Sequence, residues 1–339
     1  MRVHPAAFWI LVASAAMGVA VLSMTHGTSG MSASKALQIV WLSATGQAAE
    51  GITPADVTII RDIRLPRLCL GMLVGLCLAV AGVVMQAFFQ NPMAAPSIIG
   101  VSAGGALGAT AAMMLGFNVW FLGLSSVALT AFAGALVVTA IVYLLSRRGG
   151  RTPVAVLLLT GIALGAMAQA MASLILILFG HGQMDRVVYW MLGSLSGAGW
   201  AKVQMIWPLA AVGGLLVYIY GRDLNVLLLG DEAAQYLGLN VEQVKLVLIA
   251  LSSLLAAAGV AVAGVIGFVG LIVPHITRLI VGPDHRVLLP SAAALGAVLL
   301  ALADVGARLW GEIPIGIITS MLGGPFFLYL LHKRREYEM

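Results

Sequence analysis

"PRLCLGMLVGLCLAVAGVVMQAFF" occupies residues 66–89 and carries one charged residue, Arg67. A transmembrane helix needs about 20 mainly apolar residues, and this stretch is long enough to supply them. The strands of an outer-membrane barrel are only about ten residues long and alternate apolar with polar positions, which this stretch does not. It therefore predicts a helix that crosses a lipid bilayer.

The rest of the chain repeats this pattern. Of its 339 residues 61% are hydrophobic and 9% are charged, and the mean hydropathy is +1.05, whereas a soluble domain carries about 25% charged residues. We predict an all-α polytopic membrane protein in which residues 1–339 form a single transmembrane domain. The cluster Gly264–Gly267–Gly270 predicts a sharp reversal of the chain. About ten spans are expected, at 6–25, 66–89, 98–116, 120–145, 154–180, 201–220, 245–265, 267–282, 287–305 and 314–331.

Lysine and arginine in the short loops predict the orientation of the chain. The larger set of basic residues falls on the side that holds both termini, so we expect both termini in the cytoplasm. The net charge of +5 belongs to these loops and does not indicate a nucleic-acid partner. Because many spans follow it, the run Phe8–Met24 is interpreted as an uncleaved first helix and not as a signal peptide.

Residues 225–245, "NVLLLGDEAAQYLGLNVEQVK", are polar by comparison with their surroundings. Asp231 and Glu232 would lie in the first turn of a short helix, where acidic groups suit the helix dipole. Gly238 can end that helix in a left-handed conformation, and Asn240 can cap the next one. The pattern predicts two helices that meet at a Gly-Leu-Asn turn. It fits an ordinary cytoplasmic loop or a docking element for a partner.

Several chemistries are missing from the chain. It contains no Gly-Lys dipeptide, so it has no P-loop for ATP, and no His-Glu-x-x-His helix for zinc proteolysis. Cys69 and Cys77 are roughly 12 Å apart along one helix, too far for a disulfide. Few charges lie within the spans, which disfavours a secondary carrier without an ATPase. Asp304 and Arg308 are spaced as an (i, i+4) pair that would face water or a partner.

Close helix packing and an outer basic cluster are also expected. Three arginines in "RDIRLPR", residues 61–67, fall on the non-cytoplasmic side, against the usual charge trend. They fit either interfacial anchoring or an acidic partner. The prolines of "QNPMAAPSIIG", residues 90–100, predict a turn. Three Gly-x-x-x-Gly pairs would allow close helix approach: Gly71/Gly75, Gly104/Gly108 and Gly161/Gly165.

The motifs together resemble one family. They are "IRLPR" (63–67), "QNPMAAPSIIGVSAGGALGA" (90–109), "VVYWMLGSLSG" (187–197), "GDEAAQYLG" (230–238), "GFVGLIVPHITRLIVGPDHRVLLP" (267–290) and "EIPIGIITSMLGGPFFLYLL" (312–331). In order and without large gaps, they resemble the FecCD-type permease subunits of ABC importers for iron-siderophore chelates, haem and cobalamin. The resemblance runs from about residue 55 to the C-terminus.

This resemblance implies a non-catalytic permease of the bacterial inner membrane that works by alternating access. It implies a second copy or a close paralogue, two cytoplasmic ATPase subunits that bind ATP and magnesium, and a periplasmic binding protein. The permease itself would hold no cofactor or metal and bind no nucleic acid. The cargo would be a ferric siderophore, haem or cobalamin, although some relatives carry a small oxyanion such as molybdate. Which cargo is carried, and whether His181 or a methionine contacts it, is left open.

The resemblance also implies roles for particular residues. Asp231, Glu232, Tyr236 and Leu237 would contact the ATPase as a coupling helix. The binding protein would dock at Arg64, Arg67 and Arg308, with Arg61 nearby. The cytoplasmic gate would use Asn91, Met93, Val154 and Ala155, the last two apolar where relatives often have small polar residues. The pathway would be lined by Met167, Met171, Ser173, Thr319, Ser320 and Leu322.

Overall fold

The computed structural model describes residues 4–26, 32–45, 52–117, 120–121, 123–180 and 182–338. Over these residues the chain is almost entirely helical, as the sequence predicts. A short antiparallel strand pair, β1 (Trp120–Phe121) and β2 (Leu124–Ser125), lies at a turn before a long helix, and an isolated bridge joins Arg148 to Arg151.

Ten apolar helices correspond to the ten predicted spans. Seven are long and apolar enough to cross a membrane: α1 (Pro5–Thr25), α4 (Leu65–Phe88), α6 (Ser126–Ser146), α7 (Val154–Phe179), α9 (Trp200–Ile219), α12 (Val241–Ala263) and α14 (His285–Leu309). Three are shorter: α5 (Val101–Met114), α13 (Val269–Val281) and the apolar first part of α15 (Ile315–Glu338).

Shorter elements connect these helices, and most of them were not predicted. They are α2 (Ala33–Thr45), α3 (Pro54–Thr58), the π-helix η1 (Ile59–Arg64), the 3-10 helix η2 (Pro96–Ile99), α8 (Met184–Met191), α10 (Gly221–Leu227) and α11 (Asp231–Tyr236). The helices α3, η1 and α4 form one continuous rod from Pro54 to Phe88. This rod therefore begins at Pro54, well before the apolar run 66–89 that predicted the span.

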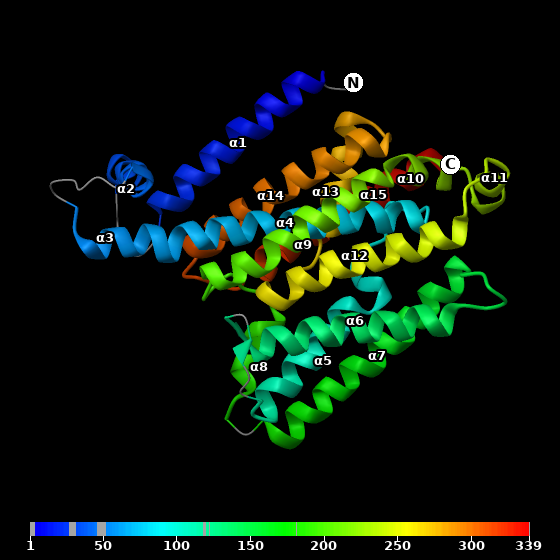
Figure 1. Cartoon of the computed structure of the whole chain (residues 1–339), viewed down its shortest axis with the longest axis horizontal. Coiled ribbons are helices and arrows are strands. Elements are labelled where there is room, and N and C mark those ends of the chain that lie inside the picture. The colour runs from blue at the N-terminus through cyan, green and yellow to red at the C-terminus, as the bar shows by residue number, and fades with distance from the viewer. Residues whose placement is uncertain are drawn as a thin grey trace.

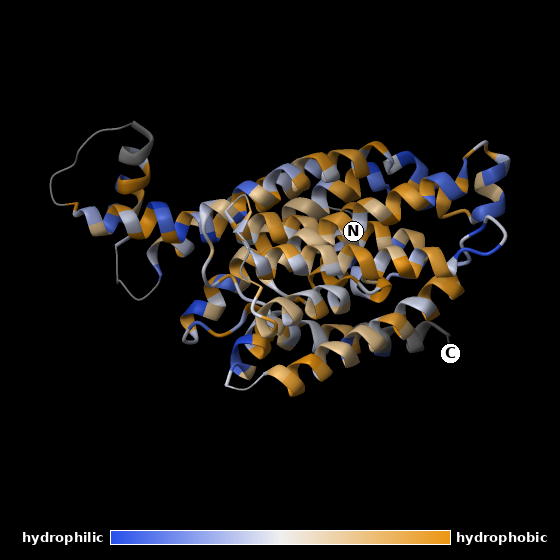
Figure 2. Ribbon diagram, turned by 60° about the horizontal axis from the view of Figure 1, so that its bottom comes forward, coloured by the Kyte–Doolittle hydropathy of each residue, from blue (hydrophilic) through white to orange (hydrophobic). Residues whose placement is uncertain are grey.

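The helix α4 is the centre of the bundle. Figure 1 shows it running through the middle of the molecule, with α9, α12 and α14 alongside and α5, α6 and α7 grouped below. Most residues of α4 and α12 are buried, whereas few residues of α7 are buried in the single chain. A helix that is apolar on all sides is covered by protein or by lipid. Hydrophobic residues fill the length of the bundle and polar residues gather at its ends (Figure 2).

Small residues allow the central helices to approach closely. A Cβ atom on Gly75 would lie 2.1 Å from the carbonyl oxygen of Gly296 on α14, and one on Gly108 would lie 2.0 Å from that of Thr130 on α6. These are backbone contacts that no larger residue permits. The predicted Gly-x-x-x-Gly contacts are confirmed, although Gly165 makes only an ordinary van der Waals contact with Ala103.

The predicted reversal lies between α12 and α13. The helix α12 ends at Ala263, and Gly264 (φ 73°) and Phe268 (φ 67°) turn the chain back. A Cβ on Gly264 would lie 2.2 Å from the carbonyl oxygen of Trp190, so both the dihedral angle and the space require glycine. Gly270 lies within α13, where it packs against α4.

Candidate coupling and docking surfaces

The polar stretch 225–245 folds as a compact helical element at one end of the bundle (Figure 1). The helix α11 begins at Asp231, ends at Tyr236 and is followed by Gly238 in the left-handed region (φ 86°). The side chain of Asn240 accepts a hydrogen bond from the Gln243 amide (3.3 Å) and caps the next helix. The predicted turn and cap are confirmed, but the second helix is the start of the long α12.

An ion pair between a buried lysine and a half-exposed aspartate holds α11 against the bundle. Lys245 of α12 is only 2% exposed, and its Nζ lies 2.5 Å from Asp231 Oδ2. The same ammonium lies over the ring of Phe88 at the end of α4, 5.7 Å from the centroid. An unpaired buried ammonium is strongly unfavourable. Asp231 therefore ties the first turn of α11 to the two most buried helices.

The face of α11 that points away from the bundle is exposed. Tyr236 is 93% exposed and Leu237 is 65% exposed, while Ala234 is fully buried against the bundle. Beside them lies a groove of about 650 Å³ whose lining includes Arg151, Glu232 and Gln235. Exposed aromatic and aliphatic groups on a rigid support are typical of an interface anchor.

A second contact steadies the same surface. The loop before α7 is tied to the start of α12, because the Thr152 backbone amide and hydroxyl donate to the two carboxylate oxygens of Glu242, at 3.1 and 2.9 Å. The sequence predicts no contact between these two residues. Only the spatial proximity of positions 152 and 242 shows their role.

The predicted gate residues lie next to α11. Val154, the first residue of α7, lines a cavity of about 320 Å³ together with Gln90 and Asp231. The Asn91 side chain accepts a hydrogen bond from the Met93 amide (2.9 Å), which forms the Asn-Pro turn. Ala155 follows on an exposed position of α7. The fold thus brings the Asn91–Met93 turn, the start of α7 and α11 to one end.

Gln90 is a further residue at this end that the sequence did not indicate. Its backbone has a positive φ of 47°, and its side chain donates to the Leu227 carbonyl oxygen at 2.9 Å. It joins the end of α4 to the end of α10, directly before α11.

Most of the predicted pathway residues are exposed in the single chain. Met167, Met171 and Ser173 are exposed on α7, and Ser320 and Leu322 are exposed on α15. Thr319 is buried, and its hydroxyl donates to the Gly316 carbonyl oxygen at 3.2 Å. His181 lies outside the described residues.

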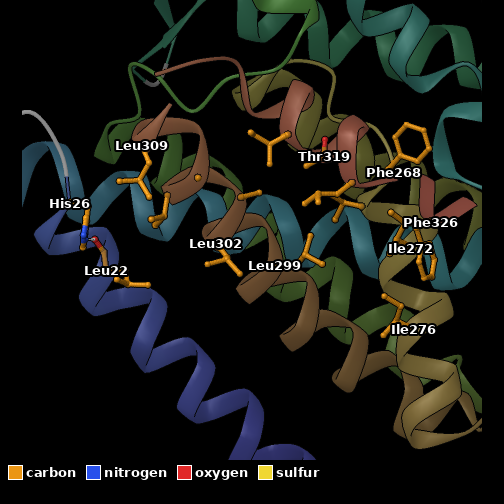
Figure 3. A pocket seen from close by; sticks show the side chains of 16 residues that line it. Leu22, His26, Phe268, Ile272, Ile276, Leu299, Leu302, Leu309, Thr319 and Phe326 are labelled. Atoms are coloured by element: carbon orange, nitrogen blue, oxygen red, sulfur yellow. Dashed lines mark hydrogen bonds between the residues drawn. The ribbon is translucent and has the colours of Figure 1, made fainter. Parts of the chain in front are cut away.

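An apolar cavity of about 550 Å³ adjoins α15. It lies between α1, α13, α14 and α15, and its wall includes Thr319, Leu322 and Phe326 (Figure 3). Thr319 and Leu322 are thus the two predicted pathway residues that the fold brings together at a cavity.

The basic cluster lies at the end of the bundle opposite to α11 (Figure 1). Arg61 is exposed, and its carbonyl oxygen accepts a hydrogen bond from Trp200 Nε1 (3.0 Å). Arg64 is 5% exposed and Arg67 is 9% exposed. The Arg67 Nε donates to both carboxylate oxygens of Asp304, at 3.0 and 3.1 Å.

The predicted pair of Asp304 and Arg308 forms, with Arg308 Nε 3.2 Å from Asp304 Oδ2. The expectation that it faces water or a partner is wrong for the single chain, because Asp304 is only 3% exposed. The helices α1 and α4 pack over the end of α14 and enclose it. No sequence pattern indicates that packing.

The chain is similar in sequence to a known family of transport proteins. The model of the FecCD transport family matches residues 13–333. The chain is 43% identical over 319 residues to the cobalamin import system permease protein BtuC of Halobacterium salinarum, covering 94% of this chain and 85% of that protein. It is 40% identical over 323 residues to the hemin transport system permease protein HmuU of Yersinia pestis, covering 94% of each.

A solved structure of an inward-facing metal-chelate type ABC transporter is similar at a TM-score of 0.84 and 31% identity, covering 97% of this chain and 100% of that one. The fold and the relatives define a polytopic transport permease. The chain belongs to the FecCD transport family, and the resemblance that its motifs indicated is confirmed.

Proposed function

We propose that this chain is the membrane-spanning subunit of an ABC importer that moves a bulky metal chelate or corrinoid inward across the bacterial inner membrane. Two copies, or one copy and a close paralogue, enclose the pathway. Two cytoplasmic ATPase subunits bind ATP and magnesium, and a periplasmic binding protein delivers the cargo. Both termini and α11 lie in the cytoplasm, and residues 1–339 act as one permease domain.

The exposed face of α11 is the observation that carries this proposal. The ion pair of Asp231 with buried Lys245 fixes the helix on the bundle, while Tyr236 and Leu237 project from it. An element that is tightly held on one side and exposes an aromatic and an aliphatic side chain on the other can transmit a push from a partner. The adjoining gate residues, Asn91 to Met93 and Val154 to Ala155, lie within the same end of the fold.

The cargo is proposed from the relatives and from the candidate pathway wall. The named relatives carry cobalamin and haem, both large ring chelates of a metal. The residues that we assign to the pathway are methionine, leucine, serine and threonine, without charge. Such a wall binds a large cargo weakly, which favours its release. The chain performs no bond chemistry, and ATP hydrolysis by the partner drives alternating access.

The test is a Tyr236→Ala/Leu237→Ala variant, purified with its cognate ATPase subunits. Buried aromatic and aliphatic anchors dominate interface energy, so we expect a loss of about 2–4 kcal/mol in ATPase affinity. The matched control is Tyr218→Ala/Leu279→Ala, because those side chains are also exposed but lie on the spans α9 and α13. Unchanged ATPase recruitment in the α11 variant would refute the coupling role.

A further inference from the structure

Two arginines converge on one carboxylate at the end of the bundle opposite to α11. Asp304 on α14 accepts two hydrogen bonds from Arg67 Nε, at 3.0 and 3.1 Å, and lies 3.2 Å from Arg308 Nε. The carboxylate and the adjacent arginine side chains are almost completely buried. A carboxylate that two guanidinium groups share in this way fixes the orientation of both.

Arg308 and the neighbouring Arg64 cap the end of α1. Arg308 donates to the carbonyl oxygens of Ser23 (3.0 Å) and His26 (3.2 Å) and to the Ser23 hydroxyl (2.8 Å). Arg64 donates to the carbonyl oxygen of Met24. The last carbonyl groups of a helix lack partners within it, and a positive charge there is favourable. Figure 3 shows this end of α1, with Leu22 and His26, beside Leu309 of α14.

Among the residues that the structure describes, this cluster holds three arginines, Arg64, Arg67 and Arg308, and two carboxylates, Asp304 and Glu312. The Glu312 Oε1 lies 3.7 Å from the Arg67 guanidinium. Glu312 is half exposed at the rim of the cluster. The cluster can therefore accept a further carboxylate from outside, but only if the arginines turn away from Asp304 and α1.

We propose that Asp304 is a positioning residue that holds Arg67 and Arg308 inward in the undocked permease, and that acidic groups of the binding protein compete with it. The proposal rests on the docking role given to these arginines in the proposed function. It adds that docking is coupled to a rearrangement at the end of α1. Loss of Asp304 therefore strengthens docking, whereas loss of the arginines weakens it.

The test uses the full-length permease in nanodiscs and its cognate binding protein, loaded with haemin or cyanocobalamin according to which it binds. Asp304→Asn keeps the shape of the side chain and removes its charge. We expect it to lower the Kd for the binding protein by about tenfold, because wild-type docking must break charge-assisted hydrogen bonds. Asp304→Glu keeps the charge and should restore an affinity near that of the wild type.

The matched control is Asp62→Asn, which removes the same charge from the same end of the bundle. Asp62 is exposed on η1 and forms no ion pair with the residues that the structure describes. Its loss should change the Kd less than twofold because exposed charges are screened. An equal gain in both variants would overturn the proposal, since it would show an effect of net charge alone.

A second variant covers the case in which Asp304→Asn does not fold. Ser23→Ala removes one hydrogen bond to Arg308 and leaves the buried carboxylate in place, so it should tighten docking by a smaller factor of about two to three. Unchanged or weaker docking in the folded variants would overturn the role of Asp304. Failure of the wild-type permease to bind any binding protein would instead overturn the proposed function.

Discussion

Gly82 is the position where a single methyl group should disturb the bundle most. It lies on α4, and a Cβ atom there would be 1.9 Å from the carbonyl oxygen of Gly270 on α13. Since Cβ contacts below 3.0 Å essentially do not occur, Gly82→Ala must separate the two backbones by at least 1.1 Å, the difference between these distances. Overpacking of this kind costs about 1–3 kcal/mol, and alanine recovers up to about 1 kcal/mol through helix propensity.

We therefore expect Gly82→Ala to lower the stability of the purified permease by about 1–2 kcal/mol. The assay is reversible unfolding in mixed detergent, followed by circular dichroism. Gly214→Ala on α9 is the matched control, because nothing lies within 4 Å of the added methyl group, and it should be neutral or stabilising. A Gly82→Ala variant as stable as the Gly214→Ala variant would show that α4 and α13 do not touch as described.

Two further results are expected from charged groups near α11. Asp231→Ala leaves Lys245 buried without its ion pair and should lower the free energy of unfolding by about 3–5 kcal/mol. The double variant Asp231→Ala/Lys245→Met should recover most of that loss. Equal stability of the single and the double variant in unfolding assays would contradict the ion pair. A hydrogen bond from the Asn225 side chain, 2.8 Å long, lowers the pKa of Asp284. An aspartate whose pKa is lowered in the folded state stabilises the fold at pH values above its unfolded pKa of about 3.9, and this stabilisation is lost as the pH falls. The stability difference between wild type and Asn225→Ala should thus narrow below about pH 4, and a gap that widens on acidification would contradict this coupling.

Features that depend on neighbouring residues in the sequence were predictable. The ten apolar runs mark the ten apolar helices, because a segment in lipid must satisfy its own backbone hydrogen bonds. The turn at Gly238 and the cap at Asn240 depend on four or five adjacent residues. The same holds for the reversal at Gly264, where only glycine fits.

Features that depend on packing between distant segments were not predictable. Residues 54–64 are too polar to be recognised as part of a membrane span, yet they extend α4 at its N-terminal end as one rod. Arg64 and Arg67 stand at the start of an apolar run, a position that suggests exposure, but α1 and α14 cover them. The bond of Thr152 to Glu242 joins residues that are 90 positions apart. No single sequence pattern specifies such pairs.

We propose that this permease moves a chelate inward when a partner subunit hydrolyses ATP. The most direct test is uptake into proteoliposomes that contain the permease and its cognate ATPase, with the loaded binding protein outside and ATP inside, for labelled cyanocobalamin, haemin and ferric citrate in turn. We expect ATP-dependent accumulation of at least one of them, lost when the binding protein is omitted and in the Tyr236→Ala/Leu237→Ala variant. Equal uptake without ATP, or accumulation that is driven by a proton or sodium gradient alone, would contradict ATP-driven import by this permease.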